Sequence, residues 1–208
     1  MIDVRELGTL QLDGLREVAN IGAGHAATAL SQLTNGRRIM LDVPRTLILR
    51  LEDVPELTGT PDEPVAAVLM RVLGDISGRT MQIFPAQTAS RLASILLRRK
   101  EVAFPEGFGD VEQSALKEAG NILAGAYLSA LSDFLGMIIL TSVPGLAIDL
   151  AGAVLTSSFL NFGEVDDYVL CIDTIFRMDE QRGALQGHFL LLPDRAALQV
   201  ILRTIRLG

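Results

Sequence analysis

The sequence predicts an α+β fold in which two similar halves share one continuous β-sheet. The halves are expected to be related by a pseudo-twofold axis, with an exposed helix from each half packed on the sheet. Two observations lead to this prediction. The stretch 13–33 recurs as 114–134 at an offset of 101 residues, with nine of 21 positions identical and no gap. Each copy is followed by the same order of strands, hairpin and closing helix, which indicates a duplicated architecture.

The first half is expected to hold a helix, four extended pieces and a second helix. These elements lie at residues 13–34, 38–43, 46–51, 65–73, 79–84 and 86–98. The pair Asn35-Gly36 is typical of a helix end, and Pro44 breaks the first strand into two extended pieces. Residues 74–78 form the turn of a hairpin, and residues 52–63, which are interrupted by proline and glycine, form a loop.

The second half repeats this order after a connector at residues 100–109. Its elements are expected at residues 111–135, 137–143, 147–159, 168–177, 185–192 and 195–206. The segment 147–159 fits either an extended or a helical conformation. Residues 178–184 are expected to form the turn between the last two strands.

The far ends of the two halves also match. Pro85 and Pro193 each follow an apolar strand end and open an amphipathic helix. Neither half has enough strands to cover its own apolar faces. We therefore expect one domain over residues 1–208, made of similar halves at about 11–99 and 110–206.

Composition excludes several classes of protein. The chain is 49% hydrophobic and only 21% charged, which argues against disorder. Its net charge of −7 and lack of any Lys/Arg-rich run argue against nucleic-acid binding.

A single cysteine, Cys171, cannot form an internal disulfide and suits a reducing compartment, where a buried structural thiol is expected rather than a nucleophile. His25 and His188 lie too far in sequence from Cys171 or an acidic cluster to suggest a metal site, and the acidic opening residues do not form a signal peptide, so we expect a cytoplasmic protein.

One long apolar stretch invites a membrane interpretation. From residue 134 to residue 162 the only charged side chain is that of Asp149, and the length would span a bilayer. Pro144-Gly145 and Gly152 divide the stretch into short pieces. We therefore expect a buried strand, a turn and a second apolar segment, and no membrane insertion.

The repeated helix has a polar side and an apolar side at about 100° per residue. The polar side carries Asp13, Glu17, Asn20, Gly24 and Ser31, matched by Ser114, Glu118, Asn121, Gly125 and Ser132. The apolar side carries Leu15, Val18, Gly22, Ala26, Ala29 and Leu33, matched by Leu116, Ala119, Leu123, Tyr127, Ala130 and Phe134. The polar side narrows to glycine and serine after the asparagine, which leaves room for another molecule to approach.

The candidate functional residues are Glu17, Asn20, Glu118 and Asn121. A single Glu-x-x-Asn on a helix is ordinary solvated surface. Asparagine is a mediocre helix former, yet it recurs at the same interior position in two copies whose neighbouring residues diverge. This recurrence favours a function over simple exposure.

Four further residues support the motif, with alternatives open for each. Asp13 and Ser114 could cap the helix starts, where acidic or hydroxyl side chains satisfy free backbone N–H groups. Gly24 and Gly125 could permit close approach of a partner, or could allow the helix to pack closely in its own core.

At these residues the sequence resembles a known family. The pattern Asp/Ser-x-x-x-Glu-x-x-Asn, then 22 residues and a proline, is similar to the signature of the CheC-type phosphatases of bacterial and archaeal chemotaxis. The second copy fits at Ser114, Glu118, Asn121 and Pro144. The first copy fits at Asp13, Glu17, Asn20 and Pro44, with 23 residues between asparagine and proline, one more than the pattern. CheX-type relatives carry one site and FliY-type relatives add a C-terminal domain, so two complete motifs in this chain place it nearest the CheC type.

The resemblance implies a phosphatase that acts on the aspartyl phosphate of a CheY-like response regulator. It implies that Asn20 and Asn121 hold the attacking water, and that Glu17 and Glu118 pair with a lysine of the regulator. It also implies that Mg²⁺ is supplied by the regulator's acidic pocket, with no cofactor on this chain.

The resemblance also bears on partners. It implies that a surface of the second half docks the receptor deamidase CheD, and Asp149 could belong to that surface or be merely exposed. A monomer is expected. The rival function is a non-catalytic adaptor that binds phosphorylated regulator or CheD. A small-molecule enzyme has no nucleophile–base pair or phosphate-binding glycine loop to support it.

Overall fold

The computed structural model describes residues 9–34, 39–50, 53–54, 61–160, 168–177 and 184–207. The helices are α1 (Thr9–Leu33), α3 (Ala86–Leu97), α4 (Asp110–Leu135), α5 (Ala151–Leu160) and α6 (Arg195–Leu207). The strands are β1 (Met40–Arg50), β2 (Pro64–Gly74), β3 (Gly78–Pro85), β4 (Ile139–Thr141), β5 (Gly145–Leu150), β6 (Tyr168–Arg177) and β7 (Ala184–Pro193). The predicted order of elements is confirmed.

The bounds of three elements differ from the prediction. The first helix begins at Thr9, and the strand expected at 137–143 is reduced to β4. The segment 147–159 is neither wholly extended nor wholly helical, because β5 ends at Leu150 and α5 begins at Ala151. The expected helix end at Asn35-Gly36, most of the loop at 52–63 and nearly all of the turn at 178–184 lie outside the described residues.

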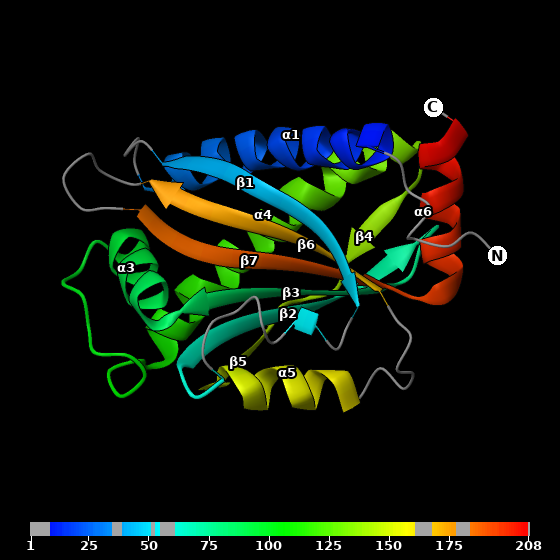
Figure 1. Cartoon of the computed structure of the whole chain (residues 1–208). Coiled ribbons are helices and arrows are strands. Elements are labelled where there is room, and N and C mark those ends of the chain that lie inside the picture. Colours follow the sequence, from blue (N-terminus) through cyan, green and yellow to red (C-terminus); the bar gives the residue numbers. More distant parts are fainter. Residues whose placement is uncertain are drawn as a thin grey trace.

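The strands form one antiparallel sheet in the order β1-β6-β7-β3-β2-β4, with β5 also paired to β2 (Figure 1). This is the predicted continuous sheet. The two halves exchange strands within it, because β1 pairs with β6 of the second half, whereas β4 and β5 pair with β2 of the first.

The pseudo-twofold axis passes between β3 and β7 at the centre of the sheet. Thr80 pairs with Leu191, and Ile83 pairs with His188. Pro85 and Pro193 are 108 residues apart. The same offset relates Thr80 to His188 and Ile83 to Leu191, so the symmetry exchanges the two pairs. The register of the two central strands therefore obeys the symmetry that the repeat predicts.

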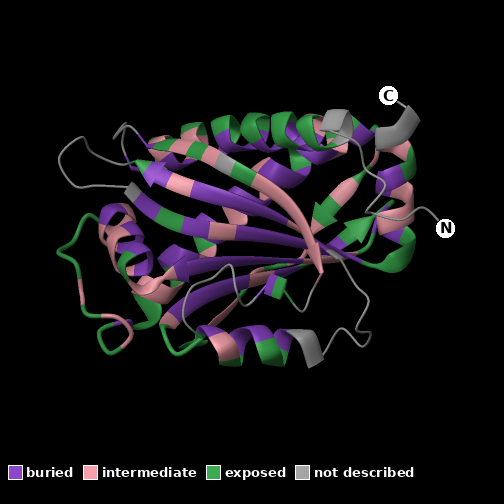
Figure 2. Ribbon diagram, in the orientation of Figure 1, coloured by how far each residue is buried: buried purple, intermediate pink, exposed green. Residues whose placement is uncertain are grey.

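Alternating side chains of the sheet are buried in two separate hydrophobic cores, one on each face. On β2, Val65 and Ala67 face the core under α5, whereas Ala66 and Val68 face the core formed with α1, α3, α4 and α6. The alternation is that expected of a strand buried on both sides. Figure 2 shows buried residues along the central strands and exposed residues along the outer side of α1. The molecule is thus a sheet with its signature helices on one face and α5 on the other.

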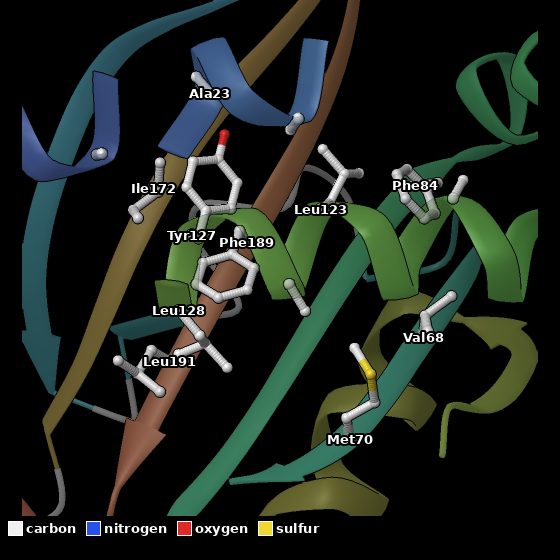
Figure 3. Close-up of a cluster of buried hydrophobic side chains, with 14 of the residues drawn as sticks. Ala23, Val68, Met70, Phe84, Leu123, Tyr127, Leu128, Ile172, Phe189 and Leu191 are labelled. Atoms are coloured by element: carbon white, nitrogen blue, oxygen red, sulfur yellow. The ribbon is translucent and has the colours of Figure 1, made fainter. Parts of the chain in front are cut away.

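Helices α1 and α4 run antiparallel and make close contact at Gly22. A Cβ atom at Gly22 would lie 2.7 Å from Cδ1 and 2.9 Å from Cα of Tyr127. The Tyr127 ring packs on Phe189 with centroids 4.8 Å apart (Figure 3). The Tyr127 hydroxyl lies 2.9 Å from the hydroxyl of Thr174. Burial raises the pKa of Tyr127 to about 12, so the phenol remains neutral. The large tyrosine of one helix thus fills the space left by the glycine of the other.

The two motif prolines lie at irregularities of the outermost strands. Pro44 falls in a register shift of β1, where Asp42 and Arg45 pair with Ile175 and Asp173. The sequence prediction that Pro44 breaks the strand is wrong, because β1 continues through it as a bulge. Pro144 lies in the gap between β4 and β5. Proline is tolerated at such positions because an outer strand does not need every N–H for pairing.

No helix among the described residues combines the length and the apolar character required to cross a bilayer.

Candidate functional site

The nine positions that are identical in the two signature helices have three different surroundings. Leu15, Ala23 and Leu30 are buried, as are Leu116, Ala124, Ala130 and Leu131, and Ala29 is half-buried. Ser31 and Ser132 bind the backbone. The remaining four positions are occupied by Glu17, Asn20, Ile21 and Gly24, all exposed in α1, and by Glu118, Asn121, Ile122 and Gly125 in α4, where Glu118 is exposed and the other three are half-buried. We call each set of four an outward stripe, since its members follow one another at helical spacing.

The candidate functional side chains are accessible. Glu17, Asn20 and Glu118 are exposed, and Asn121 is half-buried. Within the described ranges, none of these four side chains forms a hydrogen bond or an ion pair with another residue. Amide and carboxylate groups held on a rigid helix with free hydrogen-bonding capacity can therefore bind a second molecule.

The glycine of each stripe is not explained by internal packing. A Cβ atom at Gly24 or at Gly125 would meet nothing within 4 Å. The alternative that these glycines allow close packing in the helix's own core is therefore wrong. Glycine inside a helix costs roughly 0.5–1 kcal/mol relative to alanine. Internal packing among the described residues therefore does not account for glycine at these two positions.

The repeated serines have a structural role that sequence reasoning missed. The backbone N–H of Ile39 donates to Ser31 Oγ at 2.9 Å. Ser132 Oγ donates to the carbonyl of Met137. Each serine therefore fixes the chain just before the strand that follows its helix. A hydroxyl placed one turn before a helix end was the signal available in the sequence.

Asp13 and Ser114 do not cap their helices, so that alternative is wrong. Helix α1 begins at Thr9, which places Asp13 inside the helix, where it pairs with Arg16 at 3.3 Å. The N-cap of α4 is Gly109, and Ser114 lies within the helix. Both side chains are exposed one turn before the glutamate of their stripe. They therefore extend the outward stripes rather than stabilise helix ends.

The apolar sides of the helices are as predicted except at their ends. Leu33 and Phe134, which were expected in the core, are 42% and 44% exposed. Asp149 is exposed on β5, and its Oδ1 accepts a hydrogen bond from the backbone N–H of Leu150 at 2.8 Å. No described contact links Asp149 to an outward stripe.

A second cluster of polar side chains, which the sequence analysis did not predict, lies on the opposite face of the sheet. Asp173 Oδ1 is 2.9 Å from His188 Nδ1, and its Oδ2 accepts a hydrogen bond from Arg45 Nε at 2.7 Å. Cys171 Sγ lies 3.8 Å from the same carboxylate. Residues that seemed too distant in sequence for a metal site are therefore adjacent in space, because β6 and β7 pair Asp173 with His188.

The charges within this cluster are already compensated. Burial alone would raise the pKa of Asp173, but the hydrogen bonds and charges of His188 and Arg45 outweigh it and lower that pKa. Burial, together with the Asp173 charge, raises the pKa of Cys171 to about 12, which keeps the thiol protonated. Both oxygens of the buried Asp173 carboxylate therefore have partners, one of them the exposed side chain of Arg45.

Comparison with known proteins agrees with the signature helices. A family model described as CheC-like matches residues 10–48 and 111–148, one signature helix and the start of the following strands in each half. The CheY-P phosphatase CheC of Bacillus subtilis is 36% identical over 185 residues, which cover 88% of each chain.

Solved structures share the fold. The crystal structure of Thermotoga maritima FliY matches with a TM-score of 0.79 and 19% identity, over 97% of this chain and 98% of that one. The CheX–CheY–BeF3–Mg²⁺ complex of Borrelia burgdorferi matches with a TM-score of 0.51 and 15% identity, over 82% of this chain and 95% of that one. The sequence match over most of both chains establishes what the repeated motif suggests: the chain belongs to the CheC-like family.

Proposed function

We propose that this chain removes phosphate from the aspartyl phosphate of a CheY-like response regulator, with one site on α1 and one on α4. The observation that carries the proposal is the pair of outward stripes, each with a glutamate and an asparagine that have no side-chain partner among the described residues. A family member 36% identical to this chain is named as a CheY-P phosphatase, which supports the same substrate class.

The residue types fit the chemistry of an acyl phosphate. The aspartate carboxylate is already a good leaving group, so the reaction mainly lacks a water positioned in line with the breaking P–O bond. The carboxamide of Asn20 or Asn121 both donates and accepts hydrogen bonds and can hold that water. A carboxylate in the same place would be repelled by the charged phosphoryl group. The repulsion energy is about 4 kcal/mol for two unit charges 4 Å apart in an effective dielectric near 20.

The glutamates serve docking rather than proton transfer. Glu17 and Glu118 lie three residues before the asparagine, so one rigid helix presents both groups to the same region of a partner. A lysine beside the regulator's phosphorylated aspartate would form a charge-assisted pair with the glutamate. Gly24 and Gly125 follow one turn later and leave the helix backbone open to the partner's surface. Mg²⁺ would be held by the regulator.

The test is phosphate release from a phosphorylated CheY-like regulator. Asn20→Ala with Asn121→Ala is expected to reduce the rate to that of the regulator alone, because neither site can hold the water. Each single variant is expected to keep the activity of the remaining site. Gln32→Ala with Asp133→Ala is a matched control, since these exposed residues share one repeat position outside the stripes.

Binding separates catalysis from an adaptor function. The double asparagine variant is expected to bind the beryllofluoride form of the regulator about as well as the wild type, because both glutamates remain. Wild-type activity in the double variant would refute the mechanism. Binding by the wild-type protein without any acceleration of phosphate release would favour the adaptor.

A further inference from the structure

We propose that Ile21 is an apolar docking residue for the phosphorylated regulator at the first site. The inference rests on the proposed function and adds a residue that determines regulator affinity. Ile21 follows Asn20 directly and lies one helical turn after Glu17 and three residues before Gly24, in the same outward stripe.

The exposure of Ile21 is not what the fold alone would favour. Its side chain is 45% exposed on a long helix, and a β-branched residue is a weaker helix former than leucine or alanine. The same residue stands at the equivalent position 122, although core positions in the two helices differ freely, as at Gly22/Leu123 and Ala26/Tyr127. At position 122 packing against the core accounts for the isoleucine. Ile21 is outside that core, and its exposure beside Asn20 favours a contact outside the chain.

Ile21 and Ile122 differ in how much they do for the fold. Ile122 is half-buried and packs against the main core, whereas Ile21 is outside that core. Truncation of Ile122 would therefore disturb packing within the chain, and truncation of Ile21 would mainly remove surface. This difference makes Ile21 the residue at which docking can be measured without loss of stability.

The position of Ile21 places it beneath a regulator docked at Asn20. A docked regulator that brings its phosphoryl group to Asn20 must cover the neighbouring turn of α1, because Gly24 leaves no side chain there. An apolar side chain beside that turn would lose its exposure when the regulator binds, which favours association. Such a contact forms equally in the bound and transition states, so it lowers KM and leaves kcat unchanged.

The experiment isolates the first site. In a chain carrying Glu118→Ala and Asn121→Ala, which removes both the docking acid and the amide of the second site, Ile21→Ala is expected to raise KM for phosphorylated regulator about tenfold while kcat stays within twofold. The dissociation constant for the beryllofluoride form is expected to rise by a similar factor. Leu33→Ala in the same background is the control, since Leu33 is 42% exposed on the same helix but outside the stripe, and it is expected to leave both constants unchanged. Thermal unfolding of the Ile21→Ala and Leu33→Ala variants is expected to match the parent.

Three outcomes would overturn the inference. Unchanged KM and dissociation constant in the Ile21→Ala variant of an active parent would show that the side chain does not touch the regulator. A fall in kcat with unchanged KM would assign the residue to the chemical step instead. A parent with no activity and no regulator binding would refute the proposed function, and the docking inference with it.

Discussion

Gly24 lies inside a helix and faces open space. Both properties would favour alanine at this position. A methyl group there would meet nothing within 4 Å of the folded chain. It would also reduce the freedom of the unfolded backbone. Stability alone would therefore select alanine at this position.

We predict that Gly24→Ala raises the free energy of unfolding by about 0.5–1 kcal/mol, which urea titration at neutral pH would measure. The same substitution is expected to weaken binding of the beryllofluoride regulator in the background of Glu118→Ala with Asn121→Ala, because the methyl group occupies the surface over which the partner lies. A variant that is less stable than its parent would contradict this explanation of the glycine.

At the scale of residues, the sequence identified the four candidate side chains but not the reasons for their neighbours. Glu17 and Asn20 were identified because they recur in the second helix. Both are exposed, so packing in the core does not explain why they recur. It could not separate Gly24 from Ser31, since both are small residues on the polar side of the helix. Only the fold shows that Ser31 binds Ile39 while Gly24 faces open space.

At the scale of elements, the contact between α1 and α4 depends on Gly22. The two helices approach so closely that a side chain at Gly22 would collide with both the ring and the backbone of Tyr127. Backbone atoms cannot rotate away as a flexible side chain can. The helices would have to separate along their whole contact.

We predict that Gly22→Ala lowers the free energy of unfolding by about 1–3 kcal/mol, despite the better helix propensity of alanine. Thermal or urea unfolding would compare the Gly22→Ala and Gly24→Ala variants. The same glycine-to-alanine change is expected to destabilise the protein at position 22 and to stabilise it at position 24. Equal stabilisation by both would mean that α1 and α4 are not packed as described.

Most elements could be predicted because their signals are local. The hairpin of β2 and β3 has glycine and aspartate at its turn, and Pro85 marks the start of α3. The continuation of β1 through Pro44 could not be predicted in this way. A proline is compatible with a strand only at an irregularity or an outer position, and that position depends on which other strand lies beside it.

At the scale of the whole molecule, a polar network around the buried carboxylate of Asp173 joins the two halves. Arg45 belongs to β1 of the first half, and Asp173 and His188 belong to β6 and β7 of the second. The lowered pKa of Asp173 means that the folded state favours the ionised carboxylate. Its contribution to stability is therefore present above the ordinary carboxyl pKa of about 4 and is lost as pH falls through the lowered value.

We predict that Asp173→Asn lowers the free energy of unfolding by about 2–3 kcal/mol at pH 7, because hydrogen bonds to a charged, buried group are lost. The difference between wild type and variant is expected to shrink as urea titrations are carried out below about pH 4. Asp42→Asn is a matched control, since Asp42 pairs with Arg177 across the same two strands but both side chains are exposed. Its effect is expected to stay below about 1 kcal/mol. A difference for Asp173→Asn that does not change with pH would contradict the role of its charge.

The continuous sheet was predictable, whereas the exchange of strands within it was not. Repetition of a motif shows that two halves are alike and that neither can cover its own apolar faces. It does not say whether β1 pairs within its own half or with the other. The cluster of Cys171, Asp173 and His188 was missed for the same reason, since only the pairing of β6 with β7 places these residues together.

The exchanged strands also have a consequence for synthesis on the ribosome. Leu47 of β1 pairs with Cys171 of β6, 124 positions later in the chain, and β6 is the sole partner of β1 among the described strands. The nascent chain must therefore carry β1 unpaired until most of the second half has been translated. Contacts of such long sequence separation form slowly, so the duplicated halves cannot mature one after the other and the final fold must wait for nearly the whole polypeptide to emerge.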